Sequence, residues 1–224
     1  MKKYAVIVAG GSGQRMGGEV PKQFLQLKGK PLLQYTIQSF LQAYDDMIII
    51  LVLPKAHIAK GEEIIKQMDA EGKVQMAIGG ETRFESVRSG LEFISHPSIV
   101  FVQDAVRCIV SQQLIRNCFE QAVEKGSAIP AVAATDSIRI AGEISHHTID
   151  RTKVRIIQTP QTFQSEILSA AFKQAYNSSF TDEATVVEAA GKEVFLIEGE
   201  YSNLKVTRPI DLCIAEKLLE DATS

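Results

Sequence analysis

The sequence lacks the features of a disulfide-bonded, metal-thiolate or membrane-spanning protein. Its three cysteines, Cys108, Cys118 and Cys213, are odd in number and widely spaced, which argues against a disulfide framework and a thiolate metal site. No apolar stretch approaches the roughly 20 residues that a membrane-spanning helix needs. The N-terminus passes from two lysines into a short apolar run without a signal-peptide cleavage pattern. We therefore expect a cytoplasmic protein with reduced, buried cysteines.

The chain also lacks a large excess of charge of either sign. Its formal net charge is −3 over 224 residues, which gives no general attraction to nucleic acid or to an anionic membrane. Any basic site must therefore be local, and such a site could still bind a small polyanionic ligand. The length suits one well-buried α/β domain, and no repeat or linker divides it. We expect a single domain over residues 1–224.

Five short apolar runs alternate with amphipathic helical stretches. The runs are nearly continuous in apolar residues, as in strands that are buried on both faces of a mostly parallel sheet. They cover residues 4–9, 47–53, 74–78, 98–103 and 128–133. Helices are expected from Pro31, over 83–93, after Ser111 as far as Gly126, over 165–175, over 182–190 with Thr181 as cap, and over 209–219. A further strand is expected at 194–197. This alternation predicts a doubly wound α/β sheet.

Residues 135–159 interrupt the alternation. Short segments flank Ala141-Gly142, which suits a hairpin or an arm that projects from the sheet. A two-stranded arm is too small to be stable alone and needs a partner surface. We therefore expect a β-arm at about residues 136–157 that packs on a second subunit and makes the protein a homodimer.

A glycine-rich loop follows the first expected strand. Residues 8–24 have the sequence VAGGSGQRMGGEVPKQF, and the loop after a strand of an open parallel sheet lies at the edge where ligands bind. Three glycines let backbone N–H groups turn toward phosphate oxygens: Gly10, Gly11 and Gly13. Arg15 and Lys22 can neutralise the remaining charge. The pattern fails the dinucleotide, Walker A and hydrolase-elbow motifs, so an anion cradle is favoured over these sites and over an ordinary surface loop.

Two further strand ends carry candidate ligand groups. FVQDAVRC places Asp104 and Arg107 after the fourth strand, where the carboxylate could bind a ribose hydroxyl or Mg²⁺ and the arginine could orient it. A salt bridge that only stabilises the loop is the alternative. GGETRFESV places Gly79, Gly80 and Ser86 at another strand end, for ligand contact or merely for a turn and a cap.

Several motifs occur in one order along nearly the whole chain. They are GGSGQRM at 10–16, PKQ at 21–23, GGE at 79–81, DAVR at 104–107, TPQ at 159–161 and NLKVT at 203–207. In this order they resemble the 2-C-methyl-D-erythritol 4-phosphate cytidylyltransferase family. The glycine loop alone indicates only a nucleotidyltransferase, whereas IDRTKVRIIQTPQTF and NLKVTRP are more specific.

The resemblance implies a Rossmann-like nucleotidyltransferase fold and the joining of CTP to methylerythritol phosphate in isoprenoid-precursor synthesis. The attacking phosphate oxygen is already an anion, so catalysis consists mainly of positioning and charge neutralisation. It implies that Arg15, Lys22 and Lys205 are catalytic and contact the CTP phosphates. It also implies Mg²⁺ or another divalent cation, held mainly by those phosphates with Asp104 as a candidate ligand.

The resemblance further implies the binding residues. Nucleotide and phosphate contacts are expected from Ala9, Gly10, Gly11, Ser12, Gly13, Gly80, Glu81 and Ser86, with Asp104 and Ala105 beside the ribose and with Arg107 and Thr159 in the substrate site. Ser137 and Arg151 on the arm would bind the acceptor in the neighbouring subunit. Three positions depart from the family pattern: Cys108 replaces the usual proline, Ser137 a threonine and Glu81 an aspartate.

Two other functions remain open at this stage. Ribitol-5-phosphate cytidylyltransferase shares the glycine loop, the aspartate turn and TPQ, and the stretch before TPQ favours methylerythritol phosphate over ribitol phosphate. A non-catalytic nucleotide-binding regulator would use the basic loop only as an anion cradle. Cationic residues from both ends of the chain argue against it: Arg15, Lys22 and Lys205.

Overall fold

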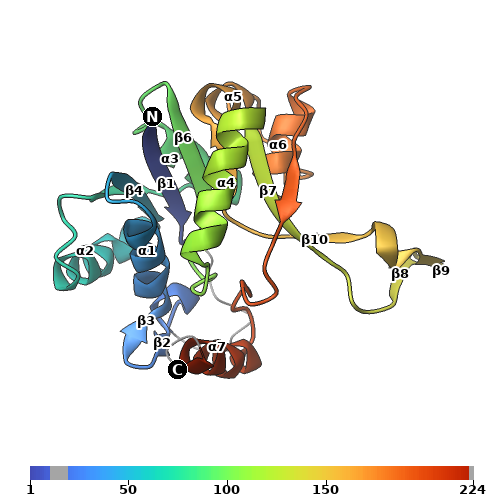
Figure 1. Cartoon of the computed structure of the whole chain (residues 1–224), viewed down its shortest axis with the longest axis horizontal. Coiled ribbons are helices and arrows are strands. Elements are labelled where there is room, and N and C mark those ends of the chain that lie inside the picture. The colour runs from blue at the N-terminus through green and yellow to red at the C-terminus, as the bar shows by residue number, and fades with distance from the viewer. Residues whose placement is uncertain (11–19, 222–224) are drawn as a thin grey trace.

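The computed structural model describes residues 1–10 and 20–221, and a mixed, mostly parallel sheet lies at its centre (Figure 1). The strand order is β10-β7-β11-β6-β1-β4-β5, and β12 pairs with β7 beside this path. Strands β1, β4, β5 and β6 are parallel to their neighbours in this group, whereas β11 is antiparallel to β6 and β7. The bounds are β1 Lys2–Val8, β4 Met47–Leu53, β5 Val74–Ile78, β6 Ser98–Asp104, β7 Ser127–Ala133, β10 Arg155–Ile157, β11 Gln161–Gln164 and β12 Leu196–Glu198.

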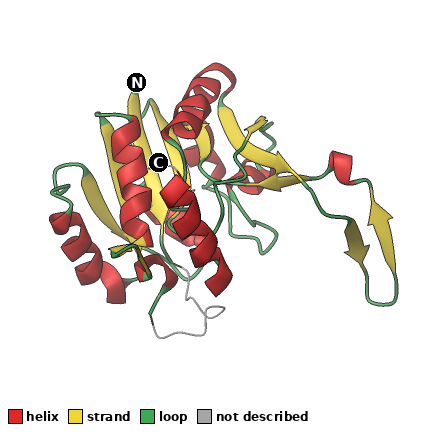
Figure 2. Cartoon of the chain, turned by 60° about the horizontal axis from the view of Figure 1, so that its bottom comes forward, coloured by secondary structure: helices red, strands yellow, loops and turns green. Residues whose placement is uncertain are grey.

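Helices cover both faces of the sheet (Figure 2). On one face pack α1 (Leu32–Ala43), α2 (Ile58–Gln67) and α4 (Gln112–Lys125), and on the other α3 (Arg83–Leu91), α5 (Ser165–Ala171) and α6 (Glu183–Ala189). Within β1, Ala5 and Ile7 face the first core and Tyr4 and Val6 the second. Side chains alternate along a strand, so an apolar run fills both cores. The doubly wound prediction is confirmed.

Local signals account for several helix ends. The Ser111 side chain accepts a hydrogen bond from Leu114 N at the start of α4, and Gly126 ends the helix with φ of 91°, both as predicted. Thr181 was expected to cap α6, but the Asp182 side chain accepts from Thr185 N instead. The spacing of apolar residues in this helix places Val123 on its buried side, yet Val123 is 42% exposed. The pattern did not predict α2 or β11.

Helix α3 brings its first residue close to the end of β6. Its N-terminus has a capping box in which Thr82 and Glu85 exchange hydrogen bonds. Farther along, a Cβ at Gly90 would lie 2.6 Å from Val6 Cγ1, so only glycine allows the helix to lie this close to β1. At the other end of the helix, Arg83 lies at the carboxyl edge of the sheet, where it contacts Asp104.

Two small sheets lie outside the central one. β2 (Gln26–Leu27) and β3 (Lys30–Pro31) pair before α1, and α7 (Pro209–Asp221) contacts β2. β8 (Ile138–Ala141) and β9 (His146–Ile149) form an antiparallel hairpin that extends away from the main body in Figures 1 and 2. The hairpin exposes apolar side chains, with Ile144 99% exposed. Among the described helices, none is long and apolar enough to cross a membrane.

Candidate active site

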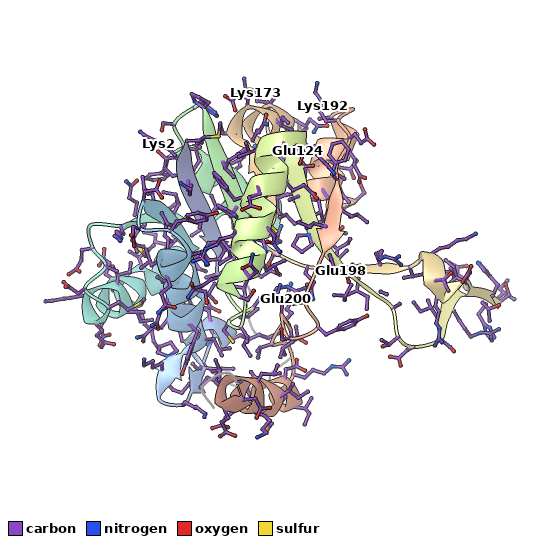
Figure 3. All side chains as sticks on the ribbon, in the orientation of Figure 1. Lys2, Glu124, Lys173, Lys192, Glu198 and Glu200 are labelled. Carbon is purple, nitrogen blue, oxygen red and sulfur yellow. The ribbon has the colours of Figure 1, made fainter. Side chains whose placement is uncertain are left out.

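A pocket opens at the carboxyl edge of the parallel strands. Its wall comes from the ends of β1, β5 and β6, the start of α3, the short 3₁₀ helix η2 (Lys22–Phe24) and the segment before α7. Lys2, Lys173 and Lys192 lie at the opposite end of the molecule (Figure 3). Nine residues singled out from the sequence line the pocket: Ala9, Gly10, Lys22, Gly80, Glu81, Ser86, Asp104, Ala105 and Lys205.

Asp104, the last residue of β6, is the electrostatic centre of this pocket. Its side chain is 12% exposed, and its carboxylate lies 2.8 Å from Lys205 Nζ and 3.3 Å from an Arg83 terminal nitrogen. Arg107 Nε is 3.8 Å away. Burial alone would raise the pKa of Asp104, but Arg83, Lys205 and Arg107 outweigh it and hold this pKa well below its usual range. The carboxylate is therefore ionised near neutral pH.

Arg83 joins Asp104 to a second buried carboxylate. One terminal nitrogen of Arg83 donates to Asp104 and the other to Glu183, the first residue of α6. Burial would lower the pKa of Arg83, but the two carboxylates raise it above its usual value. Burial also raises the pKa of Glu183, and the Arg83 charge opposes that shift.

Two lysines from opposite ends of the chain meet at the segment before α7. Lys205 follows Asn203, whose buried amide donates to Thr159 O at 2.8 Å, and Val206 N donates to Val106 O at 3.0 Å. Lys22 Nζ donates to Thr207 O at 3.3 Å in the same segment. These hydrogen bonds hold Lys205 at the pocket and bring Lys22 to the same side.

Arg107 and Thr159 lie behind the pocket wall. The guanidinium of Arg107 donates to Asn203 O at 2.7 Å and Ile157 O at 3.4 Å, so it ties two chain segments together. Thr159 Oγ1 accepts from Asp104 N at 3.1 Å. Both residues support Asp104 and Lys205 from the interior side of the site.

Other predicted residues are not brought to this pocket. Ser137 and Arg151 lie beside the strands of the hairpin and are exposed, with Arg151 donating to Thr135 O at 2.7 Å. They do not line the pocket of their own chain. Four predicted residues lie outside the described ones: Gly11, Ser12, Gly13 and Arg15.

Several residues that line the pocket or lie behind it were missed by the sequence analysis. Arg83 follows the GGE motif by two positions, and its place at the start of a capped helix next to a ligand edge was the available signal. Glu183 carried no such signal, because its partner lies 100 positions earlier. Other missed residues are Gln23, Thr82, Val106, Val206 and Thr207.

The donor set fits a divalent cation that arrives with a polyphosphate. The described residues contain no group of three or more His, Cys, Asp or Glu side chains that could hold a metal ion. Mg²⁺ usually takes one or two carboxylates together with substrate phosphates. Asp104 is the buried carboxylate in the pocket, and both of its oxygens contact cationic side chains. Phosphate oxygens would therefore supply most of the ligands.

The family model for IspD, 2-C-methyl-D-erythritol 4-phosphate cytidylyltransferase, matches residues 4–221. The chain belongs to this family. The cytidylyltransferase of Phocaeicola vulgatus is 42% identical over 219 residues, with 98% of this chain and 100% of that relative covered. The relative from Bacteroides fragilis has the same identity and coverage.

Solved structures agree in fold with this cytidylyltransferase family member. The 4-diphosphocytidyl-2C-methyl-D-erythritol synthase of Anaerococcus prevotii has a TM-score of 0.83 at 25% identity and covers 98% of both chains. The 2-C-methyl-D-erythritol 4-phosphate cytidylyltransferase of Thermus thermophilus has a TM-score of 0.75 at 30% identity, covering 96% of this chain and 98% of that one. The resemblance inferred from the motifs is thus confirmed.

Replacing Asp104 with asparagine is expected to destabilise the protein by about 3 kcal/mol at pH 7, because buried cations lose their counter-charge. The pKa of Asp104 is lowered in the folded state, so this stabilisation is present above the unfolded pKa of about 3.9 and lost as the pH falls through the folded pKa. Urea unfolding from pH 7 to pH 3 should show a difference that shrinks below about pH 5.

The matched control is Asp45→Asn, which changes an exposed aspartate and is expected to shift stability by less than about 0.5 kcal/mol. A difference between wild type and Asp104→Asn that stays constant down to pH 3 contradicts the ionic role of Asp104.

Proposed function

We propose that this family member transfers the cytidylyl group of CTP to 2-C-methyl-D-erythritol 4-phosphate, giving 4-diphosphocytidyl-2-C-methyl-D-erythritol and pyrophosphate. This step belongs to isoprenoid-precursor synthesis by the non-mevalonate route. The observation that carries the proposal is the meeting of Lys22 and Lys205 at one pocket with Asp104. The enzyme would act in the cytoplasm as one nucleotidyltransferase domain per chain.

The reaction demands positive charge rather than a base. An oxygen of the acceptor phosphate attacks the α-phosphorus of CTP and forms a new phosphorus–oxygen bond. The bond between the α-phosphorus and the oxygen that bridges it to the β-phosphorus breaks, and pyrophosphate leaves. Both reactants are anions, and their charges crowd in the transition state. Lys22 and Lys205 line the pocket, so they can neutralise this charge while the backbone of the strand ends holds the reactants in line.

The other predicted site residues are given the roles that the family resemblance implies. The chain at Ala9, Gly10, Gly80, Glu81 and Ser86 would hold the nucleotide, and Ala105 with Asp104 would lie beside the ribose. Arg15 and the glycine-loop residues Gly11, Ser12 and Gly13 would complete the phosphate contacts. Arg107 and Thr159 would act in the substrate site through Asp104. A divalent cation, Mg²⁺ or another, would offset triphosphate charge when bound, with Asp104 as its candidate protein ligand.

The hairpin would bind the acceptor substrate in the pocket of a second subunit. Arg151 is exposed and does not line the pocket of its own chain, and the apolar side chains of Ile140, Ile144 and Ile149 are exposed on the hairpin that precedes it. A two-stranded hairpin gains stability by packing on another surface. A homodimer in which each arm brings Ser137 and Arg151 to the neighbouring pocket would give Arg151 a site to act in. It would also cover the exposed apolar side chains of the hairpin.

Acceptor choice is tested by measuring pyrophosphate release from CTP and Mg²⁺ with methylerythritol phosphate or ribitol 5-phosphate. We expect turnover that is selective for methylerythritol phosphate, because the segment before TPQ matches that acceptor. Preference for ribitol phosphate would make the chain a ribitol-5-phosphate cytidylyltransferase. Release with neither acceptor, together with retained CTP binding, would favour a nucleotide-binding regulator.

Sharing of the site between subunits is tested by mixing two variants. Lys22→Ala should lower turnover far more than CTP affinity, and Arg151→Ala should raise the acceptor KM with little change in CTP binding. If each site combines the pocket of one chain with the arm of the other, a dimer of one Lys22→Ala chain and one Arg151→Ala chain has one site with both changes. Its other site carries neither change. Co-expression with two affinity tags should therefore recover about half of the wild-type activity per mixed dimer, measured at low acceptor concentration.

Each variant expressed alone is the matched control for this experiment. A purified mixed dimer no more active than the variants alone would contradict the sharing of the site. A wild-type acceptor KM for Arg151→Ala would remove that arginine from the acceptor site.

A further inference from the structure

A buried glutamate behind the pocket has no role in the scheme above. Glu183 is 1% exposed, and one of its carboxylate oxygens, Oε2, has no hydrogen-bond partner among the described residues. Its other oxygen contacts Arg83. Burying a carboxylate with one unpaired oxygen costs free energy. A carboxyl group buried at such a cost points to a use beyond packing of α6.

Arg83 is held at both ends of its guanidinium. One terminal nitrogen contacts Glu183 in α6 and the other lies 3.3 Å from Asp104 in β6. The guanidinium is a rigid planar fork, so two carboxylates on different elements fix its orientation. Its side chain is 29% exposed and reaches the pocket wall.

Because of this arrangement, the two carboxylate oxygens of Asp104 have different cationic partners. Arg83 takes Oδ1, while Oδ2 lies 2.8 Å from Lys205 Nζ. An arginine that faces a single carboxylate commonly binds both of its oxygens. If Glu183 did not hold the second nitrogen, Arg83 would be free to turn onto both oxygens and compete with Lys205.

We propose that Glu183 and Arg83 are positioning residues that act through Asp104 on Lys205. Glu183 holds one side of Arg83, Arg83 then occupies only one oxygen of Asp104, and the other oxygen holds the Lys205 ammonium at the pocket. The claim rests on the proposed function for its effect on turnover. Its structural part, the placement of Lys205, stands apart from the identity of the substrate.

A chain of contacts that acts on Lys205 differs from an ion pair that only stabilises the fold. An ion pair that merely ties α6 to α3 would affect turnover equally whether or not Lys205 is present. A positioning pair has no further effect once Lys205 is removed, because the group it places is gone. Coupling between Glu183 and Lys205, which Arg83 and Asp104 link among the described residues, is therefore the decisive quantity.

The test is a double-mutant cycle of Glu183→Gln and Lys205→Ala, with Glu188→Gln as control. Glutamine keeps the size of Glu183 but cannot ionise, whereas Glu188 is an exposed carboxylate on the same helix. Glu183→Gln should lower kcat roughly 10- to 100-fold and leave the KM for CTP within about threefold. Glu188→Gln should leave both unchanged, and Glu183→Gln should cause no further loss in the Lys205→Ala background.

Equal fold losses with and without Lys205, or a wild-type kcat for Glu183→Gln, would overturn the proposal. If Glu183→Gln does not fold, Arg83→Lys replaces it, since lysine keeps the charge but cannot hold two carboxylates in a fixed fork. Arg83→Lys should then lower kcat by the same factor in the otherwise wild-type protein and cause no further loss in the Lys205→Ala background. If the double variant instead loses activity by the product of the two single losses, the proposal is overturned.

A crystal structure of the substrate-free Glu183→Gln protein separates this claim from the proposed function. We expect Arg83 on both oxygens of Asp104 and Lys205 Nζ displaced from the carboxylate. Lys205 Nζ that remains within about 3 Å of Asp104 would overturn the positioning claim, whatever the substrate is. Absence of pyrophosphate release by the wild-type protein would overturn the proposed function alone.

Discussion

The ionised carboxylate of Asp104 can remain buried at the end of β6 only because cationic side chains from other segments meet it there. Arg83 comes from the start of α3 and Lys205 from the segment before α7, while Arg107 follows Asp104 in the next turn. A buried charge without such partners would cost several kcal/mol. This requirement brings together parts of the chain that are more than 100 residues apart, and it leaves cationic groups facing the pocket.

The sheet decides where this cluster forms. β1, β4, β5 and β6 run in one direction, so their carboxyl ends share one edge, and Asp104 lies opposite Val8 in the register of β6 with β1. Helix α3 packs closely on β1 at Gly90 and begins at the same edge with Arg83. Hydrogen bonds from Lys22 to Thr207 O and from Asn203 to Thr159 O hold the last wall of the pocket. Backbone geometry and ionic pairing therefore bring several cationic side chains to one edge of the sheet, which suits the polyanionic substrates of the proposed reaction.

Sequence patterns predicted those features that depend on local chemistry. Strands buried on both faces appear as apolar runs, and Ser111 with Gly126 marks the ends of α4. β11 was missed because its sequence, QTFQ, has one apolar residue although all but its last side chain are buried. α2 was missed because Gly61 and two adjacent glutamates obscure its apolar side. The contact between Arg83 and Glu183 depends on the packing of α3 against α6, which no local pattern reveals.

The central claim is that the lysines meeting at this edge bind the phosphates of CTP. A crystal structure of the protein with CTP and Mg²⁺, in the absence of acceptor, measures this most directly. We predict phosphate oxygens within hydrogen-bond distance of Lys22 Nζ and Lys205 Nζ, with the cytidine against Gly80 and Ala105. A triphosphate bound elsewhere, or one that contacts neither lysine, would contradict the account.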